Sequence, residues 1–69
     1  MRLSARNQIK GKILSVTKGA TTAHVRVEIA SGQVITSSIT NEAADELGLR
    51  AGASATVVIK ASDVMIAVD

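Results

Sequence analysis

Alternating apolar and polar positions predict β-strands along most of the chain. The clearest alternation lies in residues 22–30, where Ala, Val, Val and Ile are separated by His, Arg and Glu. This is the pattern of a strand with one buried face. Short aliphatic and Thr-rich segments bounded by turn residues predict four further strands, at residues 8–18, 33–40, 54–60 and 64–68.

The first of these strands changes its apolar phase midway. Ile9 and Ile13 share one face, whereas Leu14 and Val16 fall on the other. A bulge or a bend near Gly11 would explain the change, and so would burial of both faces of the strand.

A break in the alternation predicts one short helix between the third and fourth strands. Asn41 is the expected N-cap, two acidic residues suit the first turn, and Gly48 suits the position after the last turn. Five short strands with one small helix in this place fit an all-β, OB-like barrel. Because no linker or internal repeat is visible, residues 1–69 are expected to form a single domain.

The composition adds an expectation of self-association. A domain of this size buries only about 60% of the surface of its unfolded chain and usually needs a further source of stability. The chain has no Cys, no aromatic residue and one His, so disulfides, thiolate metal sites and large buried rings are excluded. Association of subunits therefore remains as the expected source of further stability. The absence of a leader-like apolar region and of a membrane-length apolar run leads us to expect a cytoplasmic protein without a membrane partner.

Catalysis has little support in the sequence. There is no phosphate-binding loop or nucleophile motif, and His24 alternates with charged residues on a polar strand face. The carboxylates are dispersed, so neither an acid–base pair nor a directly coordinated metal cation is expected. The main alternative is a nucleic-acid-binding OB module, which the pI of 9.5 permits. The lack of aromatic residues for base stacking argues against it. A purely structural assembly domain is a third possibility.

Two segments combine a cation with a hydroxyl at a strand end. They are residues 4–7, Ser-Ala-Arg-Asn, and residues 59–63, Ile-Lys-Ala-Ser-Asp. Such sets offer mainly hydrogen-bond donors, which suit a fully deprotonated tetrahedral dianion because it offers only acceptors. From the residues alone, however, a basic N-terminal tail and an ordinary strand-ending turn are the favoured interpretation.

A family resemblance favours the oxyanion site over this interpretation. The opening residues 1–13 resemble those of the molbindin family, the molybdenum-pterin-binding proteins, with Ser-Ala-Arg-Asn-Gln followed by Gly11 as the characteristic piece. The resemblance continues through residues 38–41, 47–49 and 57–64, in the order and spacing of the family. The pairing of Ser-Ala-Arg-Asn with a distant Ile-Lys-Ala-Ser-Asp-Val is the specific feature.

The resemblance implies an OB-like barrel that assembles as a homo-hexamer, in effect a trimer of dimers. It further implies storage or buffering of molybdate or tungstate, held between subunits, with no organic cofactor. This chain resembles the free-standing form of the module. The residues that the resemblance assigns to the oxyanion site are Ser4, Arg6, Thr40, Lys60, Ala61 and Ser62. Thr40 is expected to reach in from a neighbouring subunit, although it could instead cap the helix with Asn41.

The resemblance also implies a second oxyanion site near a threefold axis, at the loop after the first strand. The residues are Lys18, Gly19, Ala20 and Thr21. Gly19 allows close approach of the backbone, so amides could face an anion. An ordinary hairpin turn explains this segment equally well. At either site, sulfate should bind more weakly than molybdate because its bonds to oxygen are shorter, whereas tungstate and molybdate should be poorly discriminated.

Overall fold

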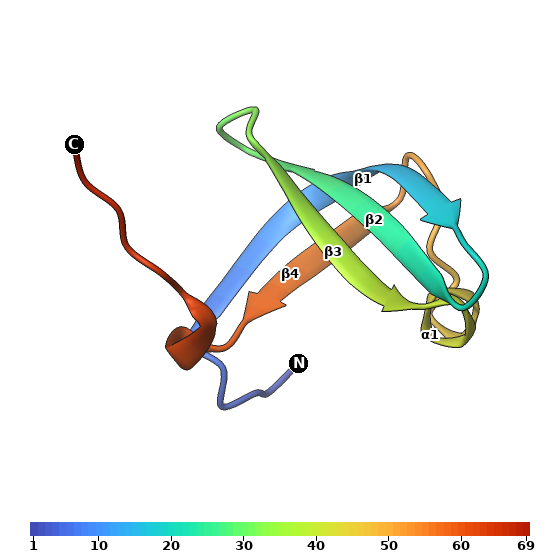
Figure 1. Ribbon diagram of the computed structural model, residues 1–69, viewed down its shortest axis with the longest axis horizontal. Helices are drawn as coiled ribbons and strands as arrows, with labels where there is room; N and C mark the ends of the chain where they lie inside the picture. The colour runs from blue at the N-terminus through green and yellow to red at the C-terminus, as the bar shows by residue number, and fades with distance from the viewer.

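The computed structural model describes residues 1–69 and consists mainly of one curled antiparallel sheet. The strand order is β3-β2-β1-β4, so β3 and β4 are the two edges (Figure 1). Neither helix could cross a membrane, since both are too short. The elements are β1 (Asn7–Lys18), β2 (Thr22–Ile29), β3 (Val34–Thr40), α1 (Asn41–Glu46), β4 (Ser54–Ile59) and the 3₁₀ turn η1 (Ala61–Asp63).

The core lies on the concave face of the sheet and consists of small aliphatic side chains. Ala23, Val25 and Val27 alternate along β2 and are buried, as the sequence pattern predicts. Ile13 from β1 packs against the two valines, and Ala44 is buried on α1. Only these five residues are fully buried, so a single chain has a small core for its size.

The phase change in β1 is a bulge, and it lies at Leu14 rather than near Gly11. Ile13 pairs with Val27, and Ser15 pairs with the residue before Val27, so Leu14 has no partner on β2. The extra residue turns Leu14 outward and brings Val16 against the core. Gly11 itself stays in regular register with both neighbouring strands.

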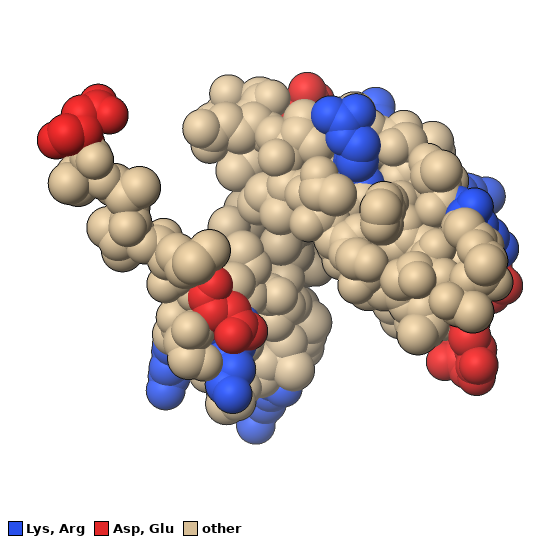
Figure 2. Space-filling view, in the orientation of Figure 1, with Lys and Arg blue, Asp and Glu red and all other residues tan.

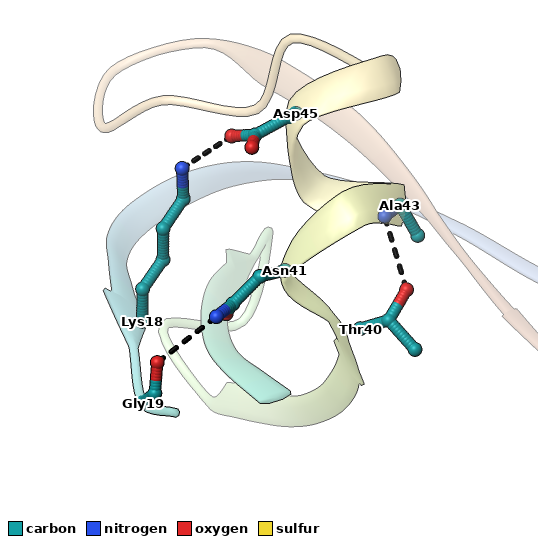
Figure 3. A network of polar contacts seen from close by, with 6 residues as sticks. All are labelled: Lys18, Gly19, Thr40, Asn41, Ala43 and Asp45. Carbon is teal, nitrogen blue, oxygen red and sulfur yellow. Dashed lines mark hydrogen bonds and ion pairs between the residues drawn. The ribbon is translucent and has the colours of Figure 1, made fainter. Parts of the chain in front are cut away.

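The helix begins one residue earlier than predicted, because Thr40 and not Asn41 is its N-cap. The Thr40 Oγ1 accepts a hydrogen bond from the Ala43 amide at 3.0 Å. Asn41 is the first helical residue, and its Nδ2 donates to the Gly19 carbonyl at 2.9 Å (Figure 3). The Asn41 side chain therefore ties the helix to the β1–β2 turn. The Thr40 hydroxyl caps the helix instead.

Replacing Thr40 by Ala is expected to lower the stability of the fold by about 1 kcal/mol, because the cap hydrogen bond is lost. In a domain of this size, this corresponds to a fall in Tm of roughly 4–8 °C. Thermal unfolding followed by circular dichroism measures it. Thr36→Ala, at an exposed position of the same strand, is the control. Equal Tm values for the two variants would show that the cap contributes nothing.

The prediction of a fifth strand at residues 64–68 is wrong for the single chain. After η1 the chain runs extended away from the sheet and pairs with no strand (Figure 1). The pattern is that of a strand, but a strand forms only beside a hydrogen-bonding partner, and this segment has none within the chain. The other four predicted strands are present, with bounds that differ by at most a residue at an end.

Candidate functional site

One surface hollow lies where the N-terminal segment meets the end of β4 and η1. Its volume is about 650 Å³. Five of the six residues predicted for the oxyanion site line it, although they come from opposite ends of the sequence. The lining residues are Ser4, Ala5, Arg6, Val58, Lys60, Ala61, Ser62 and Asp63.

The pairing of β1 with β4 brings the two segments together. Asn7 pairs in register with Ile59, and the Asn7 Nδ2 also donates to the Ile59 carbonyl at 3.1 Å. The residues just before Asn7 and just after Ile59 therefore leave the sheet side by side. The Gln8 Nε2 donates to the Ala5 carbonyl at 3.0 Å and folds the N-terminal segment over this end of the sheet. These two clamps were not assigned a role from the sequence, although both residues belong to the characteristic motif.

The two cations of the hollow have no ion-pair partner in the chain. The only ion pair in the structure joins Lys18 to Asp45, on another part of the surface. Asp63 also lines the hollow but is within salt-bridge distance of neither Arg6 nor Lys60. In Figure 2, Lys and Arg atoms gather at this end of the molecule, below the C-terminal segment, with an acidic group close by. The hollow therefore has a net positive charge, because two cations and one carboxylate line it.

Backbone donors add to this charge. The amides of Ala61 and Ser62 begin η1 and have no acceptor in the chain, as is usual for the first residues of a helical turn. The amides of the next two residues are bonded within the turn. Two cations, two hydroxyls and two free amides make a set of donors that suits the oxygens of a deprotonated oxyanion. Asp63 is the only acidic side chain that lines the hollow, and it is not among the six residues predicted for the oxyanion site.

The chemistry of the hollow does not favour a bare metal cation. No group of three or more His, Cys, Asp or Glu residues lies close enough together in the structure to hold one. Arg6, Lys60 and both serines are exposed, so in a single chain the hollow is open on one side. An anion held here by one chain alone would keep much of its hydration.

Thr40 does not line this hollow. It ends β3 beside α1, at the other end of the sheet from η1 (Figure 1). Its Oγ1 is an acceptor for the helix, which leaves the hydroxyl proton available to a further acceptor. Within one chain, therefore, Thr40 cannot join the other five predicted residues.

The four residues predicted for a second site also lie together, around a hollow of about 310 Å³. Thr17, Thr22 and His24 complete the lining. The Gly19 amide is already bonded to the Thr22 carbonyl at 2.7 Å, and the Lys18 ammonium binds the Asp45 carboxylate (Figure 3). The cation is thus compensated and a negative charge lies beside it. This hollow suits an anion less well than the first.

Comparison with known proteins identifies the family. Residues 3–66 match the TOBE domain. The chain is 53% identical over 66 residues to molybdenum-pterin-binding protein 1 of Clostridium pasteurianum, which covers 96% of this chain and 97% of the relative. The chain belongs to the molbindin family.

The solved structures of molbindins confirm the fold. The chain superposes on MopII of Clostridium pasteurianum with a TM-score of 0.91 and 49% identity, over 97% of this chain and all of that one. It superposes on ModG, described as a cytoplasmic molybdate-binding protein and solved with molybdate bound, with a TM-score of 0.90 and 49% identity. That match covers 94% of this chain and 46% of ModG. The predicted OB-like fold is therefore correct.

Proposed function

We propose that this molbindin binds molybdate or tungstate in the hollow between its N-terminal segment and η1. The observation that carries the proposal is that Arg6 and Lys60 line one hollow and neither has an ion-pair partner. The description of ModG as molybdate-binding supports the choice of ligand, since ModG shares 49% identity with this chain.

Each residue of the hollow has a distinct role in this proposal. Arg6 presents a rigid fork that donates to two oxygens at once, and the Lys60 ammonium supplies a compact second charge. The hydroxyls of Ser4 and Ser62 donate to the remaining oxygens. The free amides of η1, at Ala61 and Ser62, complete the donor set. No covalent bond is made or broken, so the role is reversible binding rather than catalysis.

The site is completed by a second subunit. Because the hollow is open and Thr40 lies far from it, Thr40 of a neighbouring subunit supplies the missing wall and one further hydroxyl. The small core of the single chain also favours association. The assembly is a homo-hexamer, built as a trimer of dimers, that stores or buffers the oxyanion in the cytoplasm. The loop at residues 18–21 is a second and weaker site.

Isothermal titration of the purified oligomer with molybdate, tungstate, sulfate and phosphate tests the function. Molybdate and tungstate should bind with similar affinity because they are nearly equal in size. Sulfate has the same charge but shorter bonds, so a cavity sized for molybdate should hold it loosely. The proposal fails if molybdate produces neither heat nor thermal stabilisation, or if sulfate binds as tightly as molybdate.

Replacing Asn7 by Ala should weaken molybdate binding without removing any charge. The clamp on the Ile59 carbonyl is lost, so the N-terminal segment no longer holds a fixed position against η1. One such hydrogen bond is worth about 1 kcal/mol, which corresponds to a roughly fivefold loss of affinity. The same titration measures it, with Gln33→Ala, in the β2–β3 turn, as a control. An affinity equal to that of the control would show that Asn7 does not position the site.

A further inference from the structure

The loop between β1 and β2 has hydrogen-bond donors for an anion but lacks a free cation. The amides of Ala20 and Thr21 have no acceptor in the chain. Thr21 and Thr22, which carry hydroxyls, line the hollow of about 310 Å³ at this loop. Lys18 lines the same hollow, but its ammonium is paired with the Asp45 carboxylate. The loop therefore differs from the first hollow chiefly in that its cation is already engaged.

The ion pair draws the Lys18 ammonium toward α1. In Figure 3 the Lys18 side chain extends from the end of β1 to Asp45, and Gly19 lies at the other end of it. Asp45 does not itself line the hollow. Its carboxylate therefore binds the ammonium from outside the hollow and engages the charge that an anion would need.

The backbone of the loop is held in place, so the Lys18 side chain is the part that can move. Asn41 donates twice at 2.9 Å, from its Nδ2 to the Gly19 carbonyl and from its amide to the Thr21 carbonyl. The Gly19 amide donates to the Thr22 carbonyl at 2.7 Å. The Lys18 side chain is flexible and 48% exposed. It can therefore turn from Asp45 to the hollow without any change in the loop.

We propose that Asp45 is a built-in competitor for the oxyanion at this loop, and that an anion binds there only by taking Lys18 from it. A carboxylate presents two negatively charged oxygens, as one edge of a tetrahedral oxyanion does. The pair is exposed and screened by solvent, so a dianion at sufficient concentration displaces the carboxylate. Asp45 then stays close by and repels the bound anion.

This inference rests on the proposed second site and gives the cause of its lower affinity. The first hollow has two cations without ion-pair partners, whereas the loop must first break an ion pair to free its cation. The loop therefore fills only after the first hollow. It adds storage capacity when the oxyanion is abundant and stays empty when the oxyanion is scarce.

Neutralising Asp45 should strengthen binding at the loop. The variants are made in the full chain with Arg6→Ala and Lys60→Ala, which remove both cations of the first hollow. In isothermal titration with tungstate at low salt, Asp45→Asn should raise the affinity about tenfold, because no pair has to be broken and the repulsion is gone. Asp45→Glu keeps the charge and should give no such rise. Glu46→Gln, the next residue of α1, removes one charge that makes no ion pair and is the matched control.

A further substitution shows whether the rise depends on the ion pair. Adding Lys18→Gln to Asp45→Asn should abolish it, because the released ammonium is then absent. Equal affinities of the Asp45→Asn and Glu46→Gln variants would overturn the proposal. So would a rise that survives Lys18→Gln, or an equal rise with Asp45→Glu.

The fate of the first hollow is measured separately, in chains that keep Lys18 and Asp45. If Arg6→Ala and Lys60→Ala changed nothing there, while Asp45→Asn still produced its rise, the proposed main site alone would be refuted. If the two substitutions removed tight binding but Asp45→Asn produced no rise, the role of Asp45 alone would be refuted.

Discussion

Replacing Arg6 by Ala is expected to weaken molybdate binding by about 10- to 100-fold. Hydrogen bonds to charged groups contribute roughly 1.5–3 kcal/mol, and each 1.4 kcal/mol is a factor of ten in affinity. Arg6 lines the hollow and makes no ion pair within the chain, so the hydrogen-bonding capacity of its guanidinium is available to the ligand. Isothermal titration measures the loss.

Arg26→Ala is the matched control for this variant, because it removes the same charge from an exposed position on β2, outside the hollow. It should change the affinity only slightly. Arg6→Lys should recover part of the loss, since it restores the charge but not the two-pronged fork. If Arg6→Ala and Arg26→Ala lost affinity equally, general attraction by positive charge would explain binding, and the assigned site would be wrong.

Replacing Gly11 by Ala is expected to destabilise the fold by about 1–3 kcal/mol, the usual cost of overpacking. A Cβ at this position would lie 2.6 Å from both the Glu28 carbonyl oxygen and the Val27 Cγ1. Gly11 lies in β1, one of the two interior strands, and pairs with residues on both β2 and β4, so relief would require the strands to separate. Each 1 kcal/mol lowers the Tm by roughly 4–8 °C in a domain of this size.

Thermal unfolding by circular dichroism tests this expectation, with Gly19→Ala as the control. A Cβ at Gly19 would approach one atom, the Thr22 carbonyl oxygen, at 3.2 Å, so a movement of a few tenths of an ångström would relieve the contact. Gly11→Ala should therefore have much the lower Tm. If it unfolded at the same temperature as Gly19→Ala, the close approach of β1 and β2 would not constrain the fold.

The strands could be predicted because one face of the sheet is buried and the other is not. The alternation through β2 is strict, and Ala23, Val25 and Val27 are buried as expected. The sequence also showed that the apolar phase of β1 changes, but it did not show at which residue. A shift of one residue moves every later side chain to the other face, and the pattern alone does not say which residue is left without a partner.

The errors at the helix and at the C-terminus have different causes. Thr40 and Asn41 are both good N-cap residues, so only the contact of Asn41 with Gly19 decides which of them caps. The segment at residues 64–68 has the pattern of a strand, but the single chain offers it no partner.

The candidate site depended on long-range pairing that composition could not reveal. Local chemistry showed two donor-rich segments, and the family resemblance connected them. The structure adds the reason that they meet, which is the register of Asn7 with Ile59. The roles of Asn7 and Gln8 as clamps, and the position of Asp63 at the hollow, were not predictable, because each depends on how distant parts of the backbone lie at this end of the sheet.

The most direct test of the central claim is a crystal structure of the protein grown with tungstate, with diffraction measured at the tungsten absorption edge. The anomalous signal of tungsten locates the anion without reference to any assumed site. The account predicts a peak in the hollow beside Arg6, Lys60 and Ser62, with Thr40 of a neighbouring subunit facing it. Tungsten found only at the loop of residues 18–21, or nowhere on the protein, would contradict the account.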